Sequence, residues 1–333
     1  MTSQRLQEIL DRASTQRLVV IGDLMLDEFV WGKVGRISPE APVPVVEVSG
    51  ESFYPGGAAN VARNLREFTD RVGVVGMIGR DHSGDTLRRL LTEQKIDTAR
   101  CPISNDCPTI VKTRIIARQQ QVVRVDREKI VAPTAEQIGS VVEAIRATLP
   151  EIDAIIFEDY GKGFLAPELV SRIVSLAHEQ RKVVAADPNP RHDISWQGLS
   201  VIKPNRSEAF HAAGIPWTEP TDSVADDEAL QKVGTTLMEK WDTQLVLITL
   251  GEQGMMLFQR GQAPHHVPTK ARQVFDVSGA GDTAIALFTL ALTAGATPLE
   301  AADIANHGSA VVVGKLGTAT VTREELLQNF ENG

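Results

Sequence analysis

Short apolar runs, each ending in a polar residue or in a Gly or Pro turn, constrain the fold of this chain more than any other feature. Stretches of helical length lie between most of them, at 83–94, 134–148, 167–179, 205–213 and 226–241. Strands that are apolar throughout and alternate with helices form parallel sheets covered on both faces. We therefore predict an α/β fold with a doubly wound, mostly parallel sheet and helices on both faces. The runs are RLVVIGD (17–23), RVGVVGMIG (71–79), DAIIFEDYGKG (153–163), KVVAADPNP (182–190), LSVIKPN (199–205) and QLVLITLGEQG (244–254).

The polar side chains that follow these runs are the first candidates for a binding site. In open parallel sheets, ligands bind at the carboxyl ends of the strands. The candidates at these positions are Asp23, Asp27, Asp159, Lys162, Asp187, Asn205 and Thr249.

Two segments break the alternation of strands and helices. Residues 29–54 contain prolines and the run VPVVEV, and residues 109–126 are β-branched with alternating charges. Both are typical of antiparallel strands, so we predict a small β-sheet lid outside the main sheet. The sequence has no internal repeat, low-complexity tract or long linker. We therefore expect residues 1–333 to form a single domain with lid segments at about 29–54 and 109–126.

The charge balance argues against a general nucleic-acid-binding protein. The net charge is −9, and no basic face is evident. The first residues lack the apolar core of a signal peptide, and no run reaches transmembrane length. Cys101 and Cys107 fit free thiols in a reducing compartment. We expect a cytoplasmic protein that binds neither nucleic acid nor a membrane.

The run DVSGAGDT at 276–283 is followed by AIALFTLALTAGA, which is typical of a buried helix. Glycines before a helix let the unpaired N–H groups of its first turn approach a phosphate closely. We predict a phosphate site here, with Asp282 as the base that starts the chemistry. The alternative is that Asp282 only stabilises the helix N-terminus. The sequence supports neither a P-loop nor a Rossmann GxGxxG fingerprint.

This run resembles the C-terminal signature of the ribokinase-like (PfkB) carbohydrate kinases. The partner signature of that family, a Gly-Gly turn that opens a helix, is matched by PGGAANVARNL at 55–65. KPNRSE (203–208), TLGEQG (249–254) and NHGSAVVVGKLGT (306–318) match further family features between and after the two signatures. The resemblance spans nearly the whole chain and implies a ribokinase-like fold with ATP-dependent sugar kinase activity.

A narrower resemblance points to members of this family that phosphorylate D-glycero-β-D-manno-heptose 7-phosphate. It rests on GDLMLDEFVWGKVGRISPEAPVPVVEV (22–48), TIVKTRIIARQQQVVRVD (109–126) and VVGKLGTATV (312–321). This resemblance implies transfer of a phosphoryl group to the anomeric O1, giving the 1,7-bisphosphate that leads to ADP-heptose for lipopolysaccharide. The chain ends soon after the last kinase helix, so we expect a kinase-only form and a separate nucleotidyltransferase.

The resemblance also implies roles on the nucleotide side of the site. Asp282 accepts the proton of the sugar hydroxyl, and the backbone N–H groups of Gly279, Ala280 and Gly281 hold the developing charge. Glu208 acts on Mg²⁺ through its water ligands. The residues expected to bind ATP are Asn205, Glu208, Thr249, Gly251 and Asn306.

The sugar side needs hydroxyl-binding groups and cations. Asp23 and Asp27 flank the turn after the first strand; the alternative is that they are solvated turn residues. On an extended strand, Lys112, Arg114 and Arg118 share one face, which suits a sugar phosphate. The alternative is that these charges mark the wet face of the lid. The full set predicted to bind substrate is Asp23, Asp27, Gly56, Gly57, Asn60, Arg114, Arg118, Lys162 and Asp187, with Lys112 and Arg124 nearby.

One segment departs from the heptose kinase pattern. Asp187-Pro188-Asn189-Pro190-Arg191 stands where that pattern has Asp-Pro-Lys-Gly, and it resembles kinases of other sugars such as ketodeoxygluconate. Either Arg191 supplies the cation or the substrate differs. The alternatives are a kinase for another sugar or sugar acid, a nucleoside kinase, and a non-catalytic nucleotide-binding regulator. We also predict a homodimer that pairs through the lid, because VPVVEV exposes an apolar face.

Overall fold

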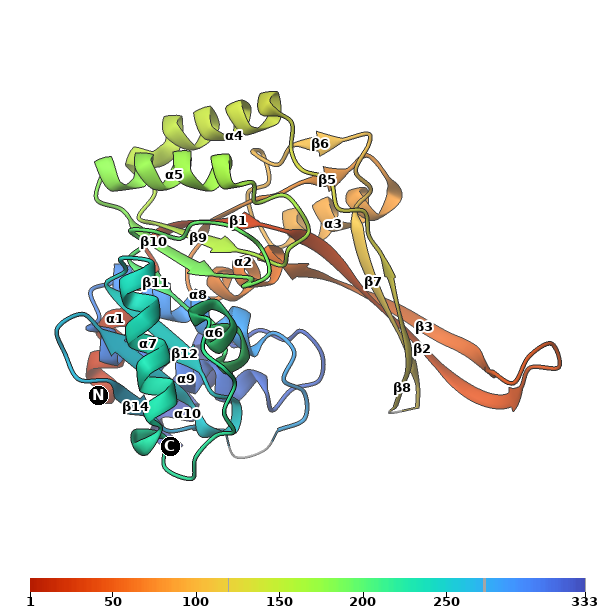
Figure 1. Ribbon diagram of the computed structural model, residues 1–333. Coiled ribbons are helices and arrows are strands. Elements are labelled where there is room, and N and C mark those ends of the chain that lie inside the picture. The colour runs from red at the N-terminus through yellow and green to blue at the C-terminus, as the bar shows by residue number, and fades with distance from the viewer. Residues whose placement is uncertain (119, 272–273, 333) are drawn as a thin grey trace.

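An eight-stranded sheet with helices on both faces forms the centre of this computed structural model, which describes residues 1–118, 120–271 and 274–332 (Figure 1). Neighbouring strands pair in parallel from β12 to β4, and β13 runs in the opposite direction, so its pairs with β12 and β14 are antiparallel. This confirms the predicted α/β fold with its mostly parallel sheet. In spatial order the strands are β14 (His265–Val267), β13 (Met255–Gln259), β12 (Leu245–Thr249), β11 (Val201–Ile202), β10 (Val183–Asp187), β9 (Ala154–Glu158), β1 (Arg17–Gly22) and β4 (Arg71–Val75).

The two faces of the sheet bury different helices. Along β1, Leu18 and Val20 enter one core while Val19 and Ile21 enter the other, as the two-residue period of a strand requires. The first core includes α1 (Ser3–Ala13), α2 (Ala58–Arg66), α3 (His82–Glu93), α8 (Ala280–Thr293), α9 (Pro298–Val312) and α10 (Arg323–Asn332). The second includes α4 (Ala135–Thr148), α5 (Pro167–Glu179), α6 (Arg206–Ala213) and α7 (Glu228–Lys240). The five helices predicted from the sequence, now α3 to α7, begin and end within two residues of the predicted bounds.

The strand order changes direction at β1. This strand lies between β4 and β9, so the chain moves to one side of β1 first and to the other side later. A parallel sheet opens a crevice at such a switch point, outside the carboxyl ends of the strands. The register places Gly22 beside Glu158, and Glu158 beside Asp187. Residues distant in sequence therefore meet at this edge.

A four-stranded sheet projects from the body as an arm (Figure 1). Its strands, in order, are β3 (Pro44–Gly57), β2 (Leu24–Ile37), β7 (Ile110–Ala117) and β8 (Gln120–Arg127). The strands begin closer to the body than predicted, because β2 follows Asp23 directly. The two hairpins are antiparallel as predicted, and the central pair β2–β7 that joins them is parallel. A separate pair joins β5 (Ile78–Gly79) to β6 (Ile103–Ser104).

Two further expectations concern the whole chain. Both cysteines are free thiols, as predicted, and Cys107 is buried. None of the helices in the described ranges combines the length and apolar character that a membrane crossing demands.

Two helical glycines allow a test of the packing of the second core. A methyl group on Gly234 of α7 would overlap the buried ring of Phe258, whereas one on Gly139 of α4 would meet nothing within 4 Å. We expect Gly234→Ala to lower the free energy of unfolding by about 1–3 kcal/mol through overpacking. Gly139→Ala should raise it by about 0.5–1 kcal/mol through helix propensity. Urea unfolding measures both, and equal effects of the two substitutions would contradict the packing described here.

Candidate active site

The carboxyl edge of the sheet gathers acidic side chains around one lysine. Glu158 ends β9, Asp187 ends β10, Lys203 follows β11, and Asp282 lies in the first turn of α8. Lys203 is 3% exposed, and its Nζ lies 2.7 Å from Oδ2 of Asp187. Glu158 and Asp282 are also buried, and Oε2 of Glu158 has no hydrogen-bond partner within the described part of the chain. The site is therefore acidic and largely screened from water.

Burial sets the ionisation of this cluster. It raises the pKa of Asp187 to about 7, raises that of Glu158 well above its usual value, and raises that of Asp282. Burial alone would lower the pKa of Lys203, but the neighbouring carboxylates, Asp187 first, outweigh it and raise that pKa. Lys203 is therefore charged near neutral pH, and the cluster favours cations or protons.

The N-terminus of α8 points its free N–H groups toward this cluster. Gly279 precedes the helix in a left-handed conformation with φ of 82°, and a Cβ there would lie 2.9 Å from Nδ2 of Asn60. The first N–H groups of a helix have no partner within it and carry its positive end. Of the three predicted donors, Ala280 already donates to the carbonyl of Val277 at 3.3 Å. A Cβ on Gly281 would lie 3.4 Å from Nζ of Lys203, so a cation stands beside this helix end.

Two side chains hold the carboxylate of Asp282. Nδ2 of Asn60 donates to Oδ2 at 2.7 Å, and the hydroxyl of Tyr160 donates to Oδ1 at 2.9 Å. Both bonds favour the charged carboxylate and oppose the effect of burial on its pKa. Asp282 is thus a buried, oriented carboxylate beside a helix N-terminus and a lysine. This arrangement suits general base catalysis on a hydroxyl group next to a bound anion.

Asp23 organises the loop that carries Tyr160. Its buried carboxylate accepts the backbone N–H groups of Tyr160, Lys162 and Phe164 at 3.1, 2.9 and 3.1 Å. Burial raises the pKa of Asp23, while these three bonds lower it. In the structure Asp23 thus holds the backbone of residues 159–164, a role that the sequence did not suggest.

The two sheets meet where glycines allow close approach. Asp27 was predicted to flank the turn after β1, but it lies inside β2 and forms an ion pair with Arg114. A Cβ on Gly56 would overlap the Asp27 carboxylate, and Gly57 has a φ of 61° at the start of α2. These glycines let the arm lie directly against the entrance of α2, which carries Asn60.

Two cations where the arm meets the body, Lys112 and Lys162, have acidic partners. Nζ of Lys112 lies 3.2 Å from Asp126 and 3.8 Å from Glu128, and Nζ of Lys162 lies 2.8 Å from Glu128. Glu128 thus joins a cation of the arm to a cation of the body. An anionic ligand here would have to displace or share these carboxylates.

Arg118 does not lie where the sequence predicted. β7 ends at Ala117, and Arg118 has a left-handed φ of 58° in the turn that follows. The expectation that it shares a strand face with Lys112 and Arg114 is therefore wrong, because the strand does not reach it. Arg124 pairs directly with Arg114 in the register and binds Asp126 at 2.9 Å.

Several residues predicted to bind nucleotide meet at the ends of β11 and β12. Asn205 caps α6, accepting the N–H of Glu208 at 2.9 Å, while Oε2 of Glu208 accepts the N–H of Asn205 at 2.8 Å. Thr249 forms an isolated parallel β-bridge with Asn205. Gly251 follows, with a φ of 61° and open space around its Cα. Asn306 lies in α9, where its amide donates to the carbonyl of Pro268 at 2.6 Å.

The donor groups fit a magnesium ion that keeps most of its water. Across residues 1–118, 120–271 and 274–332, no group of three or more His, Cys, Asp or Glu side chains is arranged to hold a metal directly. Mg²⁺ usually takes one or two carboxylates and retains several waters. The capping bond of Glu208 uses Oε2, so Oε1 of this half-buried residue can face such a hydrated ion.

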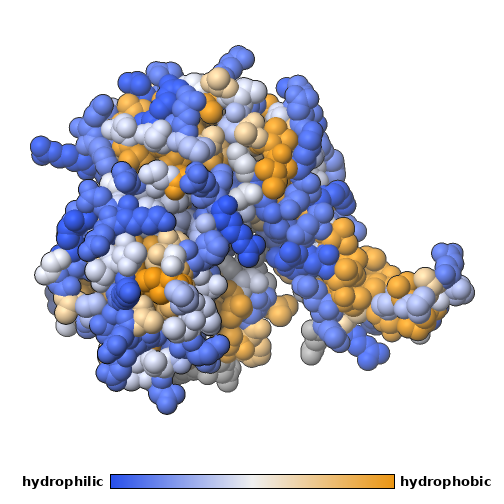
Figure 2. Space-filling model, in the orientation of Figure 1, coloured by the Kyte–Doolittle hydropathy of each residue, from blue (hydrophilic) through white to orange (hydrophobic). Residues whose placement is uncertain are grey.

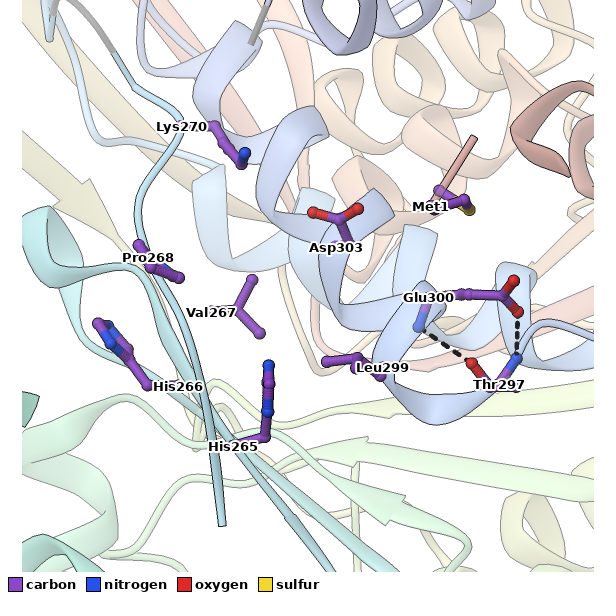
Figure 3. Close-up of a pocket in the computed structure, with 10 residues that line it drawn as sticks. All are labelled: Met1, His265, His266, Val267, Pro268, Lys270, Thr297, Leu299, Glu300 and Asp303. Carbon is purple, nitrogen blue, oxygen red and sulfur yellow. Dashed lines mark hydrogen bonds between the residues drawn. The ribbon is translucent and has the colours of Figure 1, made fainter. Parts of the chain in front are cut away.

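A pocket of about 280 Å³ lies elsewhere, between β14 and the start of α9 (Figure 3). It contains none of the residues predicted to bind sugar or nucleotide. Nε2 of His266 lies 2.7 Å from the carbonyl of Gln253, which assigns this side chain a structural contact. The lining residues are Met1, His265, His266, Val267, Pro268, Lys270, Thr297, Leu299, Glu300 and Asp303.

The sequence missed three residues that define the site. Tyr160, Glu158 and Lys203 all lie at strand ends that the pattern located, but none was singled out. Their position after an apolar run was the available signal. Arg191, offered as a replacement cation, is exposed in the loop after β10, and the cation beside Asp187 is Lys203.

Comparison with known proteins identifies relatives along nearly the whole chain. Residues 15–325 match the model of a family described as "pfkB family carbohydrate kinase". The bifunctional protein HldE of Helicobacter hepaticus is 40% identical over 316 residues, covering 95% of this chain and 64% of the relative. That of Desulfatibacillum aliphaticivorans is 40% identical over 319 residues, covering 96% and 64%. The chain thus spans less than two thirds of the length of these two relatives.

Solved structures share the fold at low sequence identity. Phosphofructokinase-2 from Escherichia coli in complex with potassium has a TM-score of 0.77 at 16% identity, covering 96% of this chain and 99% of that one. Ribokinase from Arabidopsis thaliana, complexed with ribose and ATP, has a TM-score of 0.72 at 19% identity, covering 95% and 99%. These likenesses confirm the predicted ribokinase-like fold.

The buried ion pair of Lys203 and Asp187 gives a stability test. Lys203→Met leaves the carboxyl cluster without its cation, and we expect a loss of about 3–5 kcal/mol in the free energy of unfolding. Because the pKa of Asp187 is already raised to about 7, losing the lysine makes its ionisation still more costly. The destabilisation should therefore be larger at pH 8 than at pH 5.

The matched control for this test removes both charges. The double variant Lys203→Met/Asp187→Asn should recover most of the lost stability at pH 8 in urea unfolding. A double variant that is less stable than Lys203→Met alone would contradict this. It would show that the attraction between Lys203 and Asp187 does not offset the cost of burying their two charges.

Proposed function

The chain belongs to the pfkB family of carbohydrate kinases, and we propose that it transfers a phosphoryl group from ATP to O1 of D-glycero-β-D-manno-heptose 7-phosphate. Its assignment as a sugar kinase, a phosphotransferase, rests on the family and the ribokinase-like fold. The observation that carries the reaction type is the buried Asp282 beside Gly279–Gly281 and Lys203. The heptose rests on the resemblance of residues 22–48, 109–126 and 312–321 to heptose kinases.

The chemistry of the site follows from the positions of its own side chains. Asp282 accepts the proton of the sugar hydroxyl, and Asn60 and Tyr160 keep its carboxylate oriented for that transfer. The backbone N–H groups from Gly279 to Gly281 and the ammonium of Lys203 face the charge that develops on the transferred group. Phosphoryl transfer depends mostly on positioning and charge stabilisation, which this arrangement supplies.

The nucleotide lies, in this proposal, along the ends of β11 and β12. Asn205, Glu208, Thr249 and Gly251 contact ATP, with Asn306 at the far end. ATP would supply the phosphoryl group, and Glu208 would hold Mg²⁺ through water ligands, where the ion would offset the negative charge of the phosphates. The capping bond with Asn205 fixes the orientation of Glu208 before any ligand arrives.

The sugar lies between the arm and the carboxyl edge of the sheet. Asp27, Gly56 and Gly57 border this region, and Arg114, Lys112 and Lys162 supply positive charge for a sugar phosphate. Asp23, Asn60 and Asp187 were also predicted to bind substrate. In the structure, Asp23 orders the loop, Asn60 orients the base and Asp187 pairs with Lys203. Any contact that these residues make with the sugar would be additional. Arg118 lies in the turn after β7, outside this group.

A second candidate is a kinase for another sugar or sugar acid. The observation that favours it is the segment 187–191, which departs from the heptose kinase pattern and leaves Arg191 exposed. A non-catalytic nucleotide-binding regulator is the third reading, and Asp282 in its oriented setting argues against it.

Two proposals concern partners. A cytoplasmic heptose kinase delivers its bisphosphate to a nucleotidyltransferase, which acts downstream.

The arm also exposes an apolar face (Figure 2). Directly paired residues share a face of a sheet, so the pairs of Val30 with Ile115 and of Ile115 with Val123 define this face, on which Val125 also lies. We propose that two copies of the chain pair through it.

An ATP-consumption assay tests the reaction and the substrate together. We expect turnover with heptose 7-phosphate in the presence of Mg²⁺, and little with sedoheptulose 7-phosphate, fructose 6-phosphate, ribose or ketodeoxygluconate. Asp282→Asn should lower kcat by roughly 10²–10⁴-fold, because it removes the base while keeping the side-chain shape.

The other outcomes separate the candidate functions. Turnover on ketodeoxygluconate or ribose alone would assign the specificity to the segment 187–191. Turnover that survives Asp282→Asn would remove the proposed base. No turnover on any of these sugars, with ATP binding retained, would favour the regulator.

Sedimentation velocity tests the dimer. Val123 and Val125 are each 45% exposed on the apolar face, and the double change Val123→Glu/Val125→Glu would place charges in the proposed interface. We expect the wild type to sediment as a dimer and this variant as a monomer with an unchanged circular dichroism spectrum. Ile130→Glu, at an apolar residue 65% exposed outside the arm, is the control and should remain dimeric. A dimeric double variant would place the interface elsewhere.

A further inference from the structure

Arg63 lies one turn beyond Asn60 on α2, and its contacts lead to the proposed base. Its Nη1 donates to Oδ1 of Asn60 at 3.1 Å and to the carbonyl of Thr318 at 3.0 Å. The opposite end of the same amide, Nδ2 of Asn60, donates to Asp282 at 2.7 Å. Three residues thus form one directed chain of hydrogen bonds from the half-buried Arg63 to the buried carboxylate of Asp282.

We propose that Arg63 is a positioning residue that fixes the orientation of the Asn60 amide and, through it, the carboxylate of Asp282. An asparagine amide can present either an oxygen or an NH₂ group in nearly the same space. Its oxygen facing Asp282 would set two acceptors against each other. Arginine has only donors, so its guanidinium requires that the amide oxygen face Arg63 and the NH₂ group face Asp282.

The surroundings of Arg63 make this orientation rigid. Residues three apart on a helix face each other, which brings the guanidinium onto Asn60 without a distortion of α2. The guanidinium also lies over the ring of Tyr54 at 5.8 Å, on the strand of the arm that leads into α2. Asn60 is fully buried, and its Nδ2 packs so closely against Gly279 that a Cβ there would collide with it. The amide therefore has no space to turn independently of its neighbours.

The same contacts link the base to the arm and to a distant loop. Thr318 lies between α9 and α10, and its carbonyl accepts from Arg63, while Thr320 donates to Glu67 of the segment after α2 at 2.8 Å. Within the described residues, Nε of Arg63 and Oγ1 of Thr318 are buried without a hydrogen-bond partner. Arg63 is thus held by few bonds, and the one to Asn60 leads directly to the site.

A double-mutant cycle on kcat tests this inference, which rests on the proposed kinase reaction. Arg63→Met should lower kcat by roughly ten- to a hundredfold, the range expected for a hydrogen bond to a charged group, with KM for ATP and sugar within about twofold. Asn60→Ala should lower kcat at least as much. If Arg63 acts through Asn60, the double variant should be no slower than Asn60→Ala alone. Arg66→Met makes the same chemical change on the same helix, where Arg66 contacts Gln94, and should leave kcat unchanged.

Multiplied losses in the double variant would overturn the inference, because Arg63 would then act independently of Asn60. A second measurement does not depend on activity. In protein labelled with ¹⁵N-asparagine, the side-chain amide signal of Asn60 is assigned by its absence in Asn60→Ala. We expect Arg63→Met to shift this signal and Arg66→Met to leave it in place. An unshifted signal would overturn the inference even if the kinase assay succeeds, and a shifted signal would support it even if the chosen sugars are not substrates.

Discussion

The burial of several carboxylates around one lysine is the constraint on which the rest of this site depends. Parallel strands end at one edge of a sheet, so the side chains that follow β9, β10 and β11 must share a small volume. Isolated charges are costly to bury, and burial raises the pKa of Asp187, Glu158 and Asp282. Lys203 and the N-terminus of α8 bring positive potential to the centre of the cluster. The fold therefore holds an acidic site that is ready to receive cations, and the phosphate of the proposed reaction would bind where the helix end and Lys203 converge.

The arm is coupled to this edge through side chains rather than through shared strands. Asp27 of β2 lies on Gly56 at the end of β3, and the same β3 leads into α2, which carries Asn60 and Arg63. Glu128 joins Lys112 of the arm to Lys162 of the body. A displacement of the arm would therefore disturb the charged contacts on the proposed sugar side. It would also disturb the hydrogen bonds that lead from Arg63 through Asn60 to Asp282. Closure of such an arm over a bound sugar would also exclude water, which limits wasteful hydrolysis of ATP.

Much of this architecture could be predicted from the sequence, because strands and helices leave periodic patterns. The apolar runs located the parallel strands, and the glycines before Asp282 located the start of α8. The side-chain partners could not be predicted in the same way, since they depend on which strand ends become neighbours. Lys203 follows β11 like any polar residue after a strand, and only the sheet order sets it against Asp187. Arg118 was misplaced because the two-residue period carries no signal for the residue at which a strand turns.

The partners of Asp282 also decide what can happen to the proton that it receives in the proposed reaction. Each carboxylate oxygen accepts one internal hydrogen bond, from Asn60 or from Tyr160, and an oxygen of this kind can accept more than one. Proton uptake therefore need not break either bond. Asn60 donates only at the end that faces Asp282, and burial raises the pKa of Tyr160 well above its usual value, so its hydroxyl stays protonated. Neither partner can take the proton onward into the protein. In the proposed reaction, Asn60 and Tyr160 therefore orient the base but do not carry its proton away, so recovery of the base depends on a different acceptor.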